Sequence, residues 1–86
     1  MAIGAGGCSK LLNNTSAEFI ITGEFTHHEI LHEVHRGVSV IVTDHSNTER
    51  GFIDQFIQDF TALLSKENKS IEIFRSKVDR DPLEYI

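Results

Sequence analysis

The sequence predicts an α/β fold in which helices alternate with the strands of a mostly parallel sheet. Short β-branched runs are followed by segments whose apolar residues recur every three or four positions. The segments between the runs are long enough for helical crossovers, whereas antiparallel neighbours would need only tight turns. Because the chain has 86 residues, we expect one small, partial domain over residues 1–86.

The first residues resemble the end of a strand that runs into a glycine turn. Such a beginning predicts that the chain is a segment of a longer protein. The turn Gly4–Gly7 has a faint likeness to phosphate-binding loops. It lacks the GxGxxG pattern and the GK[ST] ending, so a plain turn is the favoured interpretation. A short helix is predicted over residues 8–13.

A strand and a helix are predicted next. The run Ala17–Thr22 is short, β-branched and aromatic, and it ends at a glycine, as buried strands do. Thr26 and Glu29 have the spacing of a capping box, in which each side chain accepts a hydrogen bond from the other residue's amide. The helix that begins there is predicted to end at Arg36 and Gly37, since glycine readily adopts the positive φ of a helix end.

The second half of the chain repeats this pattern. Val38–Thr43 is predicted to be a strand because it is too short and too β-branched for a helix. Ser46–Glu49 has the spacing of another capping box, and the helix it would open runs over residues 47–65. The apolar face of this helix carries Phe52, Ile53, Phe56, Ile57, Phe60, Leu63 and Leu64. Ile71–Phe74 alternates and predicts an edge strand. A narrow sheet leaves part of the apolar face uncovered, so we expect other segments or subunits to pack there.

The composition argues against several classes of function. Eight Lys and Arg against 13 Asp and Glu give a formal charge of −5, which disfavours direct binding to nucleic acid or to anionic membranes. No apolar run approaches the ~20 residues of a membrane-spanning helix. Cys8 is the single cysteine, without CxxC or CxxH spacing, so we expect neither a disulfide nor a structural zinc site. A reducing, intracellular compartment fits this cysteine usage.

Polar side chains follow two predicted strands at their carboxyl ends, where ligands bind in open parallel sheets. Glu24 follows the first of these strands and His45 the second, while His27 and Glu49 occupy the first turns of the next helices. The spacing of His27 from the apolar residues of its helix predicts that it points toward the core. If the two strands are neighbours, the four side chains converge.

Glu49 admits two interpretations. It is the reciprocal arm of the capping box with Ser46, or it is a metal ligand. The second follows from its spacing to Phe52 and Ile53, which places it at the head of the apolar stripe instead of on the solvated face. Together with His45, Glu49 would offer an imidazole and a carboxylate to one cation. Two ligands alone do not complete a site.

Other candidate reactive side chains have simpler interpretations. His28, His32 and His35 have the i, i+4, i+7 spacing that suits chelation of a transition metal on a helix. A solvated stripe is favoured, because no cysteine or carboxylate is spaced to complete the coordination. Cys8 is interpreted as a passive thiol, since Lys10 is its only basic neighbour.

Three motifs occur in order along the chain: Ile21–His28 (ITGEFTHH), Asp44–Gly51 (DHSNTERG) and Asp79–Leu83 (DRDPL). Together they closely resemble the carboxyl-terminal segment of the eukaryotic Nif-three-like proteins. This is the family of NGG-one-interacting factor three, also called the GTP cyclohydrolase type 2 homologues. Asp44 stands where many bacterial relatives have glycine, which resembles the eukaryotic branch.

The resemblance implies an α/β protein with a dinuclear metal site between two similar halves, assembled into ring-like oligomers. His45 and Glu49 match the histidine and glutamate metal ligands of the carboxyl-terminal half. The other ligands, a His-His pair and an aspartate, belong to the amino-terminal half, and His27 with its neighbour His28 matches a different position. Zinc, iron or manganese would each accept this ligand set. Glu24 and His27 are candidates for a supporting or proton-transfer role.

Two classes of function follow from the resemblance. In the first, the complete protein is a metal-dependent hydrolase of a small nucleotide-like or phosphate-bearing substrate, and this segment alone is inactive. GTP cyclohydrolase is the activity assigned to some members. In the second, the protein is a non-enzymatic oligomeric adaptor for a transcription factor, with a structural metal. We expect a cytoplasmic protein in either case, with mitochondria and the nucleus as further locations.

Overall fold

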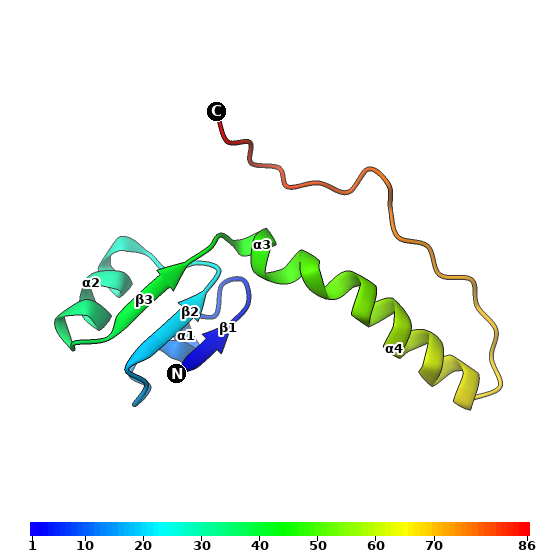
Figure 1. The fold of residues 1–86 in the computed structure, drawn as a ribbon, viewed down its shortest axis with the longest axis horizontal. Helices are drawn as coiled ribbons and strands as arrows, with labels where there is room; N and C mark the ends of the chain where they lie inside the picture. Colours follow the sequence, from blue (N-terminus) through cyan, green and yellow to red (C-terminus); the bar gives the residue numbers. More distant parts are fainter. The chain divides into compact units, whose positions relative to one another are not determined.

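The computed structural model describes all residues from Met1 to Ile86 and divides them into two compact units, Met1–Arg50 and Gly51–Ile86. The first unit contains the sheet and the helices α1 (Ser9–Leu12), α2 (His27–His35) and α3 (His45–Glu49). The second contains the long helix α4 (Ile53–Lys66) and an irregular C-terminal segment (Figure 1). All side chains that the sequence proposes for a site lie in the first unit.

The first unit is built on a three-stranded parallel sheet in the order β1-β2-β3, which confirms the predicted α/β class (Figure 1). The strands are β1 (Ala2–Gly4), β2 (Phe19–Thr22) and β3 (Ser39–Val42). Their last residues are paired with one another in register. Because the strands run in the same direction, the segments that follow all three leave the sheet at one edge.

The core of this unit is small. It centres on Leu12, Ile20 and Val38, which come from α1 (Ser9–Leu12), from β2 and from the residue before β3. The residues packed against it are Ala2, Cys8, Phe25 and Val40. The strands predicted at the start of the chain, over residues 17–22 and over residues 38–43, and the short helix predicted after the glycine turn are therefore confirmed, and they pack on one another as a unit.

The helix α2 (His27–His35) has the predicted capping box. The Glu29 amide donates to Thr26 Oγ1 at 3.3 Å, and the Thr26 amide donates to Glu29 Oε2 at 2.7 Å. The helix ends before Gly37, whose φ of 82° is the left-handed conformation expected at this position. Local sequence signals thus determine both ends of α2.

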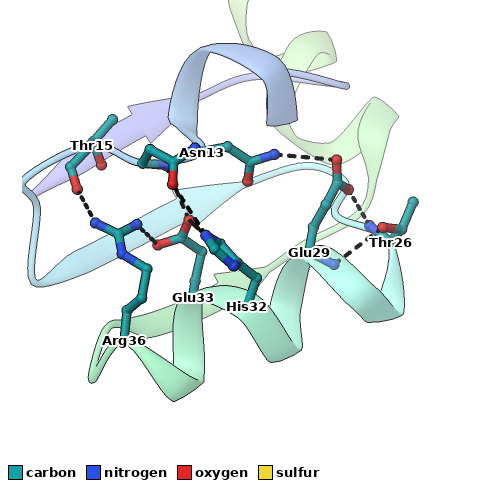
Figure 2. A network of polar contacts seen from close by, with 8 residues as sticks. Asn13, Thr15, Thr26, Glu29, His32, Glu33 and Arg36 are labelled. Carbon is teal, nitrogen blue, oxygen red and sulfur yellow. Dashed lines mark hydrogen bonds and ion pairs between the residues drawn. The ribbon is translucent and has the colours of Figure 1, made fainter.

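The buried face of α2 differs from the predicted one. Glu33 is fully buried, whereas Leu31 and Val34 are exposed and so is His27. The expectation that His27 points toward the core is wrong. The physical reason is a network of polar contacts between α2 and the loop before β2, which satisfies the Glu33 carboxylate inside the unit (Figure 2).

The helix predicted over residues 47–65 is divided into three parts. α3 (His45–Glu49) is followed by one 3₁₀ turn, η1 (Arg50–Phe52), and then by α4 (Ile53–Lys66). The interruption includes Gly51, and glycine is a poor helix former. The apolar residues of α4 thus belong to a helix separate from the one that carries Glu49.

The second predicted capping box is not formed, so that expectation is also wrong. α3 begins at His45, so Ser46 is already inside the helix and cannot cap it. The residue at the cap position is Asp44, with φ 69°, and its side chain accepts no capping hydrogen bond. Glu49 is therefore not held by Ser46 and is free to contact another partner.

In the second unit, the rings of Phe56 and Phe60 stack along α4 with centroids 5.7 Å apart. The predicted strand Ile71–Phe74 is wrong, because the residues after α4 have no regular structure. A lone strand lacks the partner that its backbone hydrogen bonds require. Arg75 instead pairs with Asp54 of α4, at 2.9 Å between Nη1 and Oδ1. No helix of the chain has the length and apolar character needed to span a membrane.

Candidate metal centre

Glu24, His45 and Glu49 lie together at the carboxyl edge of the sheet. Glu24 follows β2, while His45 and Glu49 are the first and last residues of α3, one helical turn apart on the same face. His45 Nδ1 lies 2.8 Å from Glu24 Oε2, and His45 Nε2 lies 3.2 Å from Glu49 Oε2. The imidazole is therefore held between two carboxylates.

The turn after β1 approaches this cluster with its backbone. The Gly6 amide donates to Thr48 Oγ1 at 2.8 Å, and the Gly6 carbonyl accepts from the Glu24 amide at 3.0 Å. Gly6 has a φ of 59°, which favours glycine. A Cβ on Gly6 would collide with Glu49 Oε1 and would lie 2.9 Å from His45 Nε2. The missing side chain leaves the space in which these two groups face each other.

A second glycine permits the same close approach from β2. A Cβ on Gly23 would lie 2.7 Å from Thr48 Oγ1 and 2.8 Å from the Gly6 carbonyl oxygen. Sequence reasoning missed the roles of Gly6, Gly23 and Thr48. The available signal was a glycine within two residues of the end of each of two strands that meet at one edge, since such positions favour contact between backbones.

The two carboxylates raise the pKa of His45 above its ordinary value of 6.5. The largest cause is the hydrogen bond with Glu24, and the charge of Glu49 acts in the same direction, while desolvation opposes both. The side chains remain half exposed, at 59% for Glu24, 47% for His45 and 51% for Glu49. One side of the cluster thus stays accessible within this chain.

His27 is not brought to the cluster. Its ring lies edge-on to the ring of His28, with centroids 5.8 Å apart, and its side chain is exposed. The predicted convergence therefore holds for Glu24, His45 and Glu49 but not for His27. Of the histidine stripe on α2, His32 forms a polar contact with Asn14, at 3.2 Å between Nε2 and Oδ1.

The donor set fits part of a metal site. Two ligands bound at ~2.1 Å in a tetrahedral zinc site lie about 3.4 Å apart, close to the 3.2 Å between His45 Nε2 and Glu49 Oε2. Metal-bound histidines are commonly oriented by a carboxylate on the other ring nitrogen, and Glu24 occupies that position here. No group of three or more His, Cys, Asp or Glu side chains in residues 1–86 is arranged to hold a metal ion. The chain contains two candidate ligands and one orienting carboxylate.

Fold and cluster together define the class of protein: a parallel α/β segment that presents an imidazole–carboxylate pair at the carboxyl edge of its sheet. The family described as Duf34/NIF3 (NGG1p interacting factor 3) matches residues 1–82. The chain belongs to this family, as the three sequence motifs indicated.

Curated relatives agree with this membership. The chain is 45% identical over 86 residues to "NIF3-like protein 1" of Bos taurus, which covers 100% of the chain and 22% of that protein. It is 42% identical over 84 residues to the Drosophila melanogaster protein of the same name, covering 96% of the chain and 27% of that protein. "NGG1-interacting factor 3" of Saccharomyces cerevisiae is 38% identical over 85 residues, or 96% of the chain and 28% of that protein. The chain thus spans less than a third of the length of these relatives. No solved structure is significantly similar to it.

Proposed function

We propose that His45 and Glu49 are the ligands that this segment contributes to a dinuclear metal site, and that the complete protein is a metal-dependent hydrolase. The observation that carries the proposal is that His45 Nε2 and Glu49 Oε2 face each other at 3.2 Å. The glycine turn beside them leaves room between the two groups. The remaining ligands come from the rest of the complete protein. The segment alone is therefore inactive.

Each residue of the cluster has a separate task. Glu24 accepts a hydrogen bond from His45 Nδ1, which leaves the lone pair of Nε2 available in the neutral imidazole. Glu49 supplies an anionic oxygen on the same side of α3. A divalent ion such as zinc, iron or manganese would supply Lewis acidity and lower the pKa of a water molecule. The half-exposed side of the cluster is where further ligands and a small phosphate-bearing or nucleotide-like substrate would approach.

The alternative function is that of an oligomeric adaptor with a structural metal. Its support is the name of the yeast relative, which describes that protein as interacting with NGG1. The two functions differ in the coordination of the metal, because catalytic sites keep an open position and structural sites are closed. A crystal structure of the complete protein, with the coordinated waters counted, distinguishes them.

The metal assignment is tested on the chain itself by titration with zinc chloride, followed through the NMR signals of each histidine ring. We expect weak binding at His45, because two ligands leave at least two coordination positions to water. His45→Ala and Glu49→Gln should abolish it, whereas His35→Ala, which changes an exposed histidine outside the cluster, should not. Sub-micromolar binding that survives His45→Ala would contradict the assignment.

In the complete protein, the same substitutions should empty one of the two metal positions, as measured by elemental analysis of the purified protein. Retention of both metals after Glu49→Ala would leave Glu49 without a ligand role. Hydrolysis of nucleotide-like and phosphate-bearing substrates should be lost together with that metal. Activity that persists after the metal is lost would contradict the catalytic role of the cluster and leave its role as a ligand pair standing.

A further inference from the structure

We propose that Thr48 is the positioning residue of this metal centre: its hydroxyl joins α3 to the turn at Gly6 and so sets the space between His45 and Glu49. The inference rests on the proposed function, because it concerns how the same two side chains are held for a divalent cation. Thr48 itself is not a ligand in this proposal. Its effect on the cation passes through the backbone of Gly6.

The hydroxyl of Thr48 is hydrogen-bonded in two directions, to the turn after β1 and to the start of its own helix. It accepts from the Gly6 amide at 2.8 Å and donates to the His45 carbonyl at 2.8 Å, with the Asp44 carbonyl as a second, longer acceptor at 3.5 Å. The His45 carbonyl lies in the same helical turn, whereas Gly6 is separated from Thr48 by 42 positions in the sequence. One oxygen atom therefore fixes the first turn of α3 to the turn that follows β1.

Gly6 transmits this constraint to all members of the cluster. Its carbonyl accepts from the Glu24 amide at 3.0 Å, so the turn also supports the residue that holds His45 Nδ1. The open face of its Cα lies against Glu49 Oε1 and His45 Nε2. A shift of Gly6 would close the space between these two groups or widen it.

A hydroxyl is the group that this position requires. Gly23 approaches so closely that even a Cβ there would lie 2.7 Å from Thr48 Oγ1, so the side chain is confined. Valine has the shape of threonine but neither accepts nor donates a hydrogen bond, which leaves the buried Gly6 amide without its partner. Serine retains the oxygen and loses only the methyl group.

The experiment compares Thr48→Val with Thr48→Ser in the 86-residue chain. Thr61→Val is the matched control, because Thr61 Oγ1 makes a similar bond to its own helix, to the Ile57 carbonyl at 2.7 Å, and belongs to the second unit. Two quantities are measured by NMR: the Kd of zinc at the His45 ring and the hydrogen exchange of the Gly6 amide. We expect Thr48→Val to weaken zinc binding about tenfold and to remove the protection of the Gly6 amide. Thr48→Ser and Thr61→Val should preserve both.

The outcomes separate this inference from the proposed function. An unchanged zinc Kd in Thr48→Val, with zinc binding lost in His45→Ala, overturns the positioning role and leaves the ligand assignment standing. Zinc binding that survives His45→Ala overturns the ligand assignment and the positioning role with it. Should Thr48→Val unfold the sheet, as seen at the Ile20 amide, Thr48→Ala replaces it, since alanine also removes the hydroxyl and is a better helix former than valine. A folded Thr48→Ala chain with weaker zinc binding supports the proposal, and one with unchanged binding overturns it.

Discussion

Glu33 of α2 is fully buried and forms an ion pair with Arg36, the residue at the C-terminal cap of that helix, at 2.7 Å between Oε2 and Nη1. Its other oxygen accepts from the Asn14 amide at 3.2 Å, and Arg36 Nη2 donates to the Thr15 carbonyl at 2.9 Å (Figure 2). These bonds join α2 to the loop between α1 and β2. A buried carboxylate, and not an apolar side chain, is thus central to this packing.

Removal of the guanidinium should destabilise the first unit strongly. Arg36→Met leaves Glu33 charged and buried without its ion-pair partner. Loss of one partner from a buried pair costs roughly 3–5 kcal/mol, and we expect about 2 kcal/mol here because Arg36 is partly exposed. Thermal unfolding followed at the methyl signals of the buried Ile20 should show a Tm lower by roughly 10 °C. Arg75→Met, which breaks the exposed pair with Asp54, is the control and should cost at most about 1 kcal/mol. Equal effects of the two substitutions would contradict the role of burial.

The capping box of α2 should make stability depend on acid pH. The pKa of Glu29 is lowered below its ordinary value of 4.5. The largest cause is the hydrogen bond with the Thr26 backbone, and the hydrogen bond with the Thr26 side chain acts in the same direction. The ionised carboxylate therefore stabilises the folded state above about pH 4.5, and this contribution is lost as the pH falls through the lowered folded pKa. Glu29→Gln should remove this contribution to the pH dependence of the free energy of unfolding, measured at the Ile20 signals. Glu18→Gln, which changes an exposed carboxylate, should retain it. A pH profile identical in both variants would refute the assignment.

The pKa of His45 should depend on Glu24. Glu24→Gln removes the main cause of the raised pKa, which should move down toward 6.5 in an NMR titration of the metal-free chain. In that chain, the stabilisation from the protonated ring is fully present below pH 6.5 and is lost as the pH rises through the raised pKa. Glu72→Gln, in the second unit, should leave the pKa of His45 unchanged.

Zinc binding should have the opposite pH dependence. A proton and the metal ion compete for His45 Nε2, so zinc affinity should rise as the pH increases through the pKa of His45. The measurement is the zinc titration of the His45 ring repeated across that range. Zinc affinity that falls or stays constant with rising pH would mean that the ion binds without the imidazole.

Asp44→Gly should stabilise the first unit. Asp44 has φ 69° and ψ 150°, a conformation that is essentially restricted to glycine and costs another residue ~1–3 kcal/mol. Glycine loses more conformational entropy on folding, which offsets roughly 0.5–1 kcal/mol of the strain that is relieved. We therefore expect the free energy of unfolding, measured at the Ile20 signals, to rise by about 1 kcal/mol. Asp44→Ala keeps the Cβ and should give no gain. A gain with alanine equal to that with glycine would point to the carboxylate instead of the backbone.

The apolar side chains of η1 and α4 should drive self-association of the chain. Phe52 of η1 and Phe56 and Leu63 of α4 are each more than half exposed, and burial of such side chains contributes roughly 1.5–3 kcal/mol apiece. Sedimentation at high micromolar concentration should show dimers or larger species that Phe56→Ser reduces. Tyr85→Ser, which removes an exposed aromatic ring from the C-terminal segment, should not. A compact monomer with a sharp thermal transition would contradict this expectation.

Sequence patterns alone predicted the helices and strands that are encoded by a few neighbouring residues. The β-branched runs define β2 and β3, and the ends of α2 follow from Thr26, Glu29 and Gly37, because each of these signals acts over a few residues. The position of Glu24 and His45 after two strands also predicted that they would meet, since parallel strands end at a common edge. The family was recognisable from motifs for the same reason: they are contiguous in sequence.

Tertiary contacts decided the positions of side chains whose spacing in the sequence suggested a different, local contact. Ser46 and Glu49 had the spacing of a capping box, yet the helix begins at His45, and Glu49 faces the imidazole instead. The turn at Gly6, far away in the chain, bonds Thr48 of this helix and leaves space beside the two groups. Glu33 is buried for a similar reason, because the loop before β2 supplies its partners. Hydrogen bonds across such distances depend on how the strands bring the loops together, and no local pattern encodes that arrangement.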